Sequence, residues 1–126
     1  MSGTRLAWSA VVLEVGDLKR ALAHYCDRLG FEIEFVHEGF YAGVQRDGCR
    51  VHLKQMAQGA SVQARTDREG HIDACFGVRA LEALAAGFVH SGADFAVPLR
   101  QMPYGSEFCL RDPDGHVLAF VESAAD

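Results

Sequence analysis

The sequence predicts an α+β protein built from two similar βαβββ modules. The order of one strand, one helix and three further strands occurs twice along the chain. A polar segment without hydrophobic periodicity, Met56–Gly70, separates the two copies. The length of 126 residues is that of one ordinary domain. We therefore predict a single domain with half-modules at about 1–57 and 70–126, whose sheets form an incomplete barrel around a cleft with the helices outside.

The first module is predicted to begin with an apolar strand at Ala10–Val15. Asp17 occupies the N-cap position of a helix over 18–29, and Gly30 lies at its C′ position, where a positive φ must be tolerated. The three strands that follow are predicted at Phe31–Val36, Phe40–Arg46 and Arg50–Gln55. On the first strand, Val11, Leu13 and Val15 should face the helix, whereas Ala10, Val12 and Glu14 should face the cleft.

The second module repeats this order from a strand at Ile72–Val78. Apolar residues at helical spacing from Leu81 to Phe88 predict a helix, and Gly92 follows its end. The remaining strands are predicted at Phe95–Arg100, Glu107–Arg111 and His116–Glu122. Pro98 places its strand at a sheet edge or a bulge. The sequence Asp112-Pro113-Asp114-Gly115 predicts a type I turn with no further role.

Composition and charge exclude several classes of protein. The net charge is -5, and no stripe of Lys and Arg suggests a nucleic-acid partner. No apolar run approaches the roughly 20 residues of a membrane helix. The four cysteines are widely spaced without a CxxC pair, so we expect free thiols, no zinc knuckle and a cytoplasmic location.

Two segments carry a resemblance to a known family. The run from Val15 to Phe31, VGDLKRALAHYCDRLGF, and the run from Tyr104 to Phe120, YGSEFCLRDPDGHVLAF, resemble the vicinal oxygen chelate superfamily of glyoxalases, bleomycin-resistance proteins and dioxygenases. Together with FYAGVQRD from Phe40, they are most similar to the bleomycin-resistance proteins. The resemblance implies a homodimer that binds a cationic antibiotic in clefts at the dimer interface, without chemistry. Other members of the superfamily are metal-dependent lyases, isomerases, dioxygenases and thiol transferases.

The resemblance also implies where a metal would bind. Enzymes of this superfamily place ligands on the cleft faces of the first, fourth, fifth and eighth strands. Here those positions fall at Ala10, at or near His52, at Asp73 (or at His71 if the fifth strand slips by two residues), and at Ala119. An alanine side chain has no lone pair to donate, so at most two ligands remain. We therefore expect no metal cofactor, with a divalent metal as the alternative.

The remaining candidates point to ligand binding. Four aromatic residues lie at strand starts and loops, namely Trp8, Phe40, Tyr41 and Tyr104. They could stack on a flat ligand or pack at a subunit interface. His52 is turned toward the cleft by its neighbours Val51 and Leu53. Asp73 could pair across the sheet with Arg50, Lys54 or His52, or could hold a cationic ligand, and Glu107 could add negative charge to the cleft.

The sequence therefore predicts a binding protein that sequesters a planar or cationic small molecule in a dimer-interface cleft. The predicted ligand-binding residues are Trp8, Phe40, Tyr41, His52, Asp73, Tyr104 and Glu107. One alternative is a metal-dependent lyase or dioxygenase that uses His52 with Asp73 or His71. Another is a metal-free isomerase in which His52 acts as a base.

Overall fold

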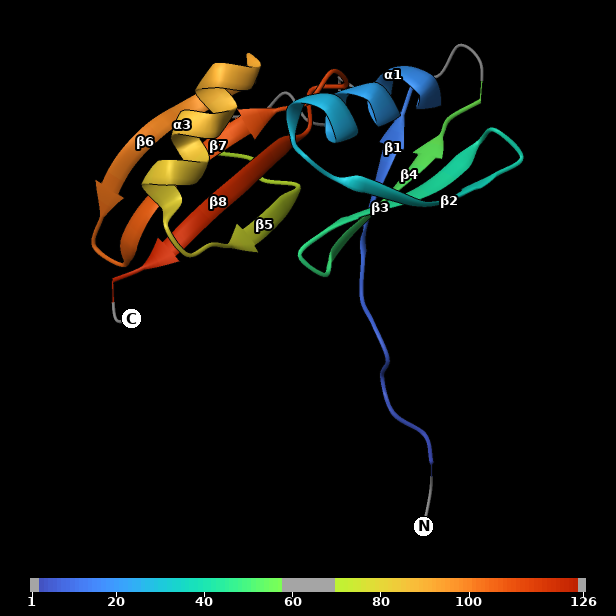
Figure 1. Cartoon of the computed structure of the whole chain (residues 1–126), viewed down its shortest axis with the longest axis horizontal. Helices are drawn as coiled ribbons and strands as arrows, with labels where there is room; N and C mark the ends of the chain where they lie inside the picture. Colours follow the sequence, from blue (N-terminus) through green and yellow to red (C-terminus); the bar gives the residue numbers. More distant parts are fainter. Residues whose placement is uncertain (1–2, 58–69, 125–126) are drawn as a thin grey trace.

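A computed structural model of the chain describes residues 3–57 and 70–124, which form two four-stranded sheets (Figure 1). The first module contains β1 (Val11–Val15), α1 (Leu18–Ala23), η1 (His24–Arg28), β2 (Glu32–His37), β3 (Tyr41–Arg46) and β4 (Cys49–Gln55). The second contains β5 (Ala74–Gly77), α3 (Leu81–Ser91), β6 (Asp94–Met102), β7 (Gly105–Arg111) and β8 (Val117–Ser123). The predicted repeat of βαβββ modules is confirmed. Most of the predicted linker Met56–Gly70 lies outside the described residues.

The two sheets have the same topology. Their strand orders are β1-β4-β3-β2 and β5-β8-β7-β6, and neither sheet closes into a barrel. In each sheet the first strand pairs in parallel with the last, and the other pairs are antiparallel. β6 is an edge strand, and its register with β7 shifts between Val97 and Arg100, where Pro98 lies. The prediction that Pro98 marks an edge or a bulge is therefore confirmed, since proline cannot donate to a ladder.

The predicted alternation of β1 is also confirmed. Leu13 and Val15 are buried against the helix, whereas Val12 is 54% exposed on the opposite face. The caps of the first helix follow the sequence as well. The Asp17 carboxylate accepts a hydrogen bond from the backbone N–H of Arg20, and Gly30 has a φ of 77°.

The helix predicted over 18–29 differs from expectation in its second half. It is α-helical only to Ala23 and continues as a π-helical turn, in which the N–H of Leu29 donates to the carbonyl of His24. Contacts with the second module hold this wider turn. The Tyr25 hydroxyl donates to Asp112, and the Arg28 guanidinium donates to the carbonyl of Gly92. Hydrophobic periodicity within the helix carries no information about such distant partners.

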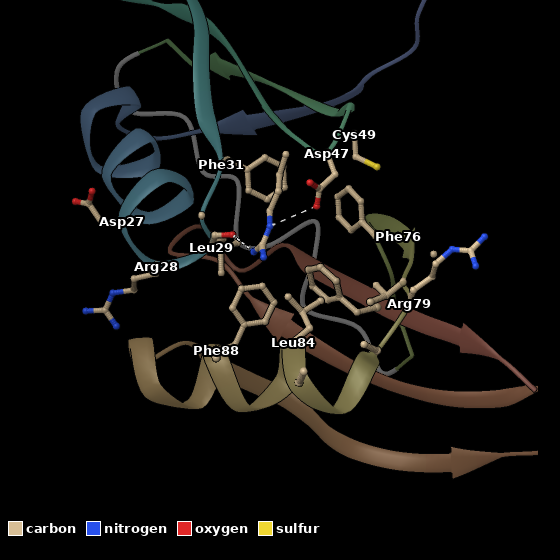
Figure 2. Close-up of a pocket in the computed structure, with 18 residues that line it drawn as sticks. Asp27, Arg28, Leu29, Phe31, Asp47, Cys49, Phe76, Arg79, Leu84 and Phe88 are labelled. Carbon is tan, nitrogen blue, oxygen red and sulfur yellow. Dashed lines mark hydrogen bonds and ion pairs between the residues drawn. The ribbon is translucent and has the colours of Figure 1, made fainter.

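One continuous hydrophobic core joins the two modules. The Phe31 ring of the first module contacts the Phe76 ring of the second, with centroids 6.3 Å apart (Figure 2). Phe76 in turn stacks on Phe120, which lies against Phe88 of α3. The helix-covered sides of the two sheets therefore share one core, and each sheet keeps one uncovered face. No helix among the described residues is long and apolar enough to span a membrane.

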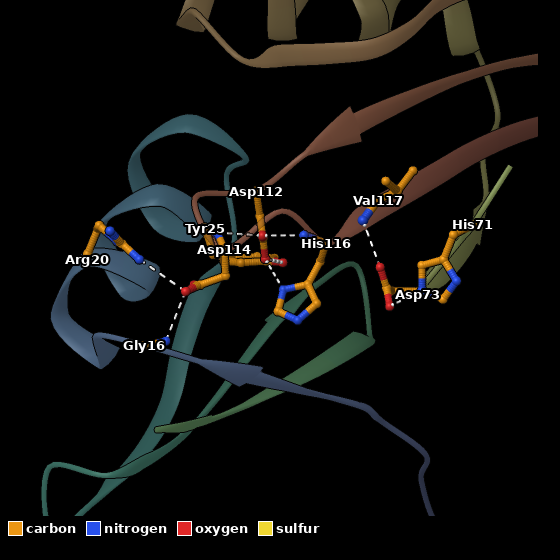
Figure 3. Close-up of polar contacts among 9 residues, drawn as sticks. All are labelled: Gly16, Arg20, Tyr25, His71, Asp73, Asp112, Asp114, His116 and Val117. Carbon is orange, nitrogen blue, oxygen red and sulfur yellow. Dashed lines mark hydrogen bonds and ion pairs between the residues drawn. The ribbon is translucent and has the colours of Figure 1, made fainter. Parts of the chain in front are cut away.

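The turn at Asp112 does more than the sequence predicts. Its backbone forms the expected turn, in which the Gly115 N–H donates to the Asp112 carbonyl. Its buried carboxylate also accepts hydrogen bonds from the Tyr25 hydroxyl and from His116 Nδ1, both at 2.8 Å (Figure 3). The same carboxylate also accepts hydrogen bonds from the backbone N–H groups of Asp114 and His116. The expectation of a turn with no further role is wrong, because the side chain links the C-terminal hairpin to the first helix.

Asp114 makes a second link between the modules. Its Oδ1 accepts hydrogen bonds from the backbone N–H of Gly16 and from the Arg20 guanidinium, at 2.9 and 3.0 Å (Figure 3). The residues of one short turn thus fix the position of the first module against the second.

Candidate functional site

Four aromatic side chains gather on the uncovered face of the first sheet. This aromatic cluster consists of Trp8, Phe35, Tyr41 and His52. The His52 ring lies at its centre, with ring centroids 5.4 Å from Trp8, 5.3 Å from Phe35 and 5.5 Å from Tyr41. Three of the four, Trp8, Tyr41 and His52, are among the residues predicted from the sequence. Flat, partly accessible rings of this kind can stack on a planar ligand.

The strand register explains the position of His52. Its neighbours Val51 and Leu53 are fully buried in the core, so its side chain points to the uncovered face as predicted. The Tyr41 hydroxyl lies 3.0 Å from His52 Nδ1, and this hydrogen bond fixes the orientation of both rings.

Phe35 is the member of the cluster that sequence reasoning missed. In a regular strand, Phe31, Ile33 and Phe35 would share the face that Phe31 buries. The pairing of β2 with β3 shifts between Ile33 and Phe35, so Phe35 lies opposite Gly43 instead of continuing the pattern. Its ring covers Gly43, where an added Cβ would stand 2.3 Å from a ring carbon. Strand periodicity does not reveal this bulge. The one sequence feature consistent with it is Gly43 on the partner strand, because a glycine leaves room for the Phe35 ring.

One ion pair lies at the edge of the aromatic cluster. The Arg50 guanidinium lies over the Trp8 ring, 5.6 Å from its centroid, and forms a 3.1 Å ion pair with Glu34. Trp8 remains 59% exposed and Phe35 39% exposed. The cluster therefore offers accessible apolar rings beside an arginine whose charge Glu34 offsets.

Two other predicted residues meet on the uncovered face of the second sheet. Glu107 on β7 is buried, and its carboxylate accepts hydrogen bonds from the Tyr104 hydroxyl and from the Arg100 guanidinium. These hydrogen bonds, from Tyr104 first and Arg100 second, lower the pKa of Glu107. The carboxylate thus stays ionised, but Arg100 offsets the negative charge that we expected it to add. Tyr104 is half-exposed beside this pair.

The last two predicted residues join neither group. Phe40 contacts the His37 ring, with centroids 5.6 Å apart, at the turn before β3. Asp73 lies just before β5, where one carboxylate oxygen is 2.8 Å from His71 Nε2 and the other accepts the backbone N–H of Val117. These contacts differ from the cross-sheet pairs with Arg50, Lys54 or His52 that the sequence suggested.

The residues at the expected metal positions do not fit a metal. The strand register places Val12, and not Ala10, directly opposite His52. On the second sheet, Ala119 lies between Cys75 and Cys109. No group of three His, Cys, Asp or Glu side chains able to hold a metal ion occurs in the described part of the chain. Alkyl side chains at two of the four positions leave too few donor atoms for a resident metal.

Solved structures with this fold span almost the whole chain. The bleomycin-binding protein of Streptomyces verticillus, solved with copper(II)-bleomycin, is 24% identical with a TM-score of 0.74, over 95% of this chain and 98% of that one. TnmS3, an antibiotic-binding protein from Streptomyces sp. CB03234, is 15% identical with a TM-score of 0.73, over 98% and 100% of the two chains. A superfamily member from Alicyclobacillus acidocaldarius is 15% identical with a TM-score of 0.78, over 94% and 92%.

Sequence comparison agrees with the fold. No curated protein is significantly similar to the chain in sequence. The family model of the Glyoxalase/Bleomycin resistance protein/Dioxygenase superfamily matches residues 8–120, which include both modules. On that match and on the fold, the chain belongs to the Glyoxalase/Bleomycin resistance protein/Dioxygenase superfamily.

Proposed function

We propose that this protein binds and sequesters a planar small molecule, without chemical turnover, by stacking it on the aromatic cluster. The observation that carries the proposal is the gathering of Trp8, Phe35, Tyr41 and His52 on one accessible sheet face. Two proteins of the same fold support it, since one is solved with copper(II)-bleomycin and another is described as antibiotic-binding. Because Glu34 and Glu107 each have an arginine partner, stacking contributes more to affinity than attraction of a cation.

We further propose that two copies of the chain complete each binding cleft. The uncovered faces expose large apolar side chains, namely Trp8, Val12, Phe35 and Tyr104. The segment before β1 extends away from the body of the molecule, and its Leu6 is 99% exposed (Figure 1). Apolar surface of this extent favours a protein–protein contact. In a homodimer, the aromatic cluster of one copy would face the Tyr104–Glu107 group of the other.

The proposed role requires neither a metal nor a nucleic acid. The side chains at Val12 and Ala119 cannot ligate a cation. All four cysteines are free thiols, which fits the proposed cytoplasmic location, where thiols stay reduced.

The single tryptophan of the chain, Trp8, reports directly on ligand binding. Titration with bleomycin, with the flat cation proflavine and with the flat neutral riboflavin should quench its fluorescence saturably for at least one of them. Calorimetry should confirm the affinity. Phe35→Leu should weaken binding by roughly three- to tenfold, because an aromatic contact contributes about 0.5–1.5 kcal/mol.

The matched control is Phe40→Leu, which removes an exposed aromatic ring at the end of the same hairpin but outside the cluster. It should bind as the wild type does. Absence of saturable quenching by all three probes would refute stacking on the cluster. A stoichiometric divalent metal in the purified protein, lost in His52→Ala, would instead indicate the metal-dependent enzyme.

A further inference from the structure

A groove separate from the aromatic cluster runs between the two modules (Figure 2). It has a volume of about 790 Å³ and lies on the helix-covered side. The first module contributes the end of η1 and the turn between β3 and β4, and the second contributes β5 and one side of α3. None of the seven residues predicted as ligand-binding lines it. We refer to it as the intermodule groove.

The walls of the intermodule groove are aromatic and aliphatic. Phe31 and Phe88 line it but are buried in the core, whereas Phe76 and Leu84 of α3 are only partly buried and offer accessible apolar surface (Figure 2). The accessible aromatic and aliphatic surface thus belongs to the second module, and the first module supplies Arg46 beside it. A ligand with a flat apolar body and an anionic group would contact both modules at once.

One guanidinium lies beside this apolar surface, on a side chain that is 38% exposed. Arg46 donates from Nη1 to the backbone carbonyl of Leu29 at 2.7 Å, and its guanidinium carbon lies 5.8 Å from the centre of the Phe88 ring. Among the described residues its ion partner is Asp47, at 3.8 Å from Nε, and that carboxylate is 91% exposed. A pair of this length at the surface is weak, so the remaining N–H donors of Arg46 are available to an anion.

The other two arginines at the groove serve different purposes. Arg28 donates to the carbonyl of Gly92 at 2.6 Å, and the side chains of Arg28 and Arg79 point away from the centre of the groove (Figure 2). Arg46 therefore marks the place where a negative group would bind.

The α3 side of the groove is kept open by small residues. Gly87 stands in the interior of α3, and an added Cβ there would meet no atom within 4 Å. The same holds for Gly77 on β5. Glycine in a helix interior destabilises the helix, and no close neighbour requires it here. Both glycines line the groove, so the sequence leaves open space at its edge that a side chain could occupy.

We propose that the intermodule groove is a second binding site, for a small aromatic carboxylate. The ring of the ligand would lie on the partly exposed side chains of Phe76 and Leu84, and its carboxylate would accept hydrogen bonds from Arg46. The charge of Arg46 selects a carboxylate over a neutral ligand of the same shape. Because the ligand would bridge both modules, it would also raise the unfolding temperature of the protein.

The test uses 2-naphthoate and its neutral analogue 2-naphthamide as probes in calorimetry on the full chain. We expect 2-naphthoate to bind at least tenfold more tightly than 2-naphthamide. Gly87→Leu, which adds a bulky side chain at a residue that lines the groove, should reduce 2-naphthoate affinity at least tenfold. The matched control Gly87→Ala adds one methyl group and should leave the affinity within about twofold. Arg46→Gln should abolish the preference for the carboxylate.

Each contrary result is informative. Equal binding of the two probes, no binding of 2-naphthoate, or unchanged affinity in Gly87→Leu would overturn the proposal. If Phe35→Leu weakens 2-naphthoate binding and Gly87→Leu does not, the probe stacks on the aromatic cluster. The groove proposal then fails, whereas the proposed function stands. If Arg46→Gln lowers the unfolding temperature, Gly87→Leu still decides the question, because an added Cβ at Gly87 meets no atom within 4 Å.

Discussion

Asp112 links the two modules through its buried carboxylate, which accepts hydrogen bonds from Tyr25 and His116. Burial alone would raise the pKa of its carboxyl group, but hydrogen bonds from His116 and Tyr25 outweigh burial and lower the pKa below its ordinary value of 3.8. Burial alone would lower the pKa of His116, but the hydrogen bond and charge of Asp112 raise it above 6.5. The pKa of Tyr25 is raised well above 10.0 by burial and by Asp112. The carboxylate and the imidazolium therefore stabilise each other's charged form.

These opposite pKa shifts predict how stability depends on pH. A raised histidine pKa contributes stability that is complete below 6.5 and is lost as pH rises through the folded-state pKa. A lowered aspartate pKa contributes stability that is complete above 3.8 and is lost as pH falls through the folded-state pKa. The pair should therefore contribute most between these two ordinary values. His116→Gln should lower the free energy of unfolding by about 2 kcal/mol at pH 6 and by less at pH 9.

Urea denaturation of wild type and His116→Gln between pH 4 and pH 9 measures this effect. His90→Gln serves as the control, since His90 is an exposed histidine near the end of α3. A loss of stability in His116→Gln that is the same at every pH would show that the imidazole charge contributes nothing.

At the scale of elements, α3 begins without a capping side chain of its own. Ala80 stands at the N-cap position with a φ of 58°, and a left-handed alanine offers no oxygen to the first turn. Glu122 of β8 supplies it instead. Its two carboxylate oxygens accept the backbone N–H groups of Leu81 and Ala80, at 2.9 and 3.1 Å. The neighbouring strand therefore determines where this helix starts.

Removing this cap should destabilise the second module. Glu122→Ala should lower the free energy of unfolding by about 1 kcal/mol, within the range found for capping side chains. Glu82→Ala is the matched control, because Glu82 is an exposed acid in the first turn of α3 and should cost less than about 0.5 kcal/mol. Chemical denaturation followed by circular dichroism distinguishes the two. Equal losses would mean that the charge near the helix end matters, and not the two hydrogen bonds.

At the scale of the whole molecule, five of the seven predicted ligand-binding residues fall on two different sheet faces. Trp8, Tyr41 and His52 lie on the first sheet, and Tyr104 and Glu107 lie on the second. The helix-covered sides of the two sheets share the core, so the uncovered faces of one chain do not pack on each other. A second copy of the chain is the partner that would bring the two groups together.

This arrangement predicts complementation between two defective variants. In a homodimer, Trp8→Ala and Tyr104→Ala should each weaken both clefts. A mixed dimer should regain one cleft, formed by the intact Trp8 of one chain and the intact Tyr104 of the other. With random pairing in a co-expressed equal mixture, about a quarter of all clefts should bind normally.

Calorimetric titration of the mixture, with the probe that binds the wild type most tightly, gives the number of high-affinity sites. Light scattering should first show a dimer. If the mixture binds no better than the separate variants, each cleft is built from a single chain.

The sequence by itself determined the order of elements and the faces of most strands. The repeat, the caps at Asp17 and Gly30 and the bulge at Pro98 follow from local periodicity and from the backbone chemistry of single residues. The same local reasoning turned His52 toward the uncovered face, because strand neighbours alternate.

Only the tertiary structure decided which distant residues meet. A bulge in β2 turns Phe35 toward the aromatic cluster. Asp112, a turn residue, is the buried acceptor for Tyr25 and His116. Arg100 offsets the charge of Glu107. Each outcome depends on strand register or on packing between the modules. Such contacts join residues far apart in the chain, and local propensity carries no information about them.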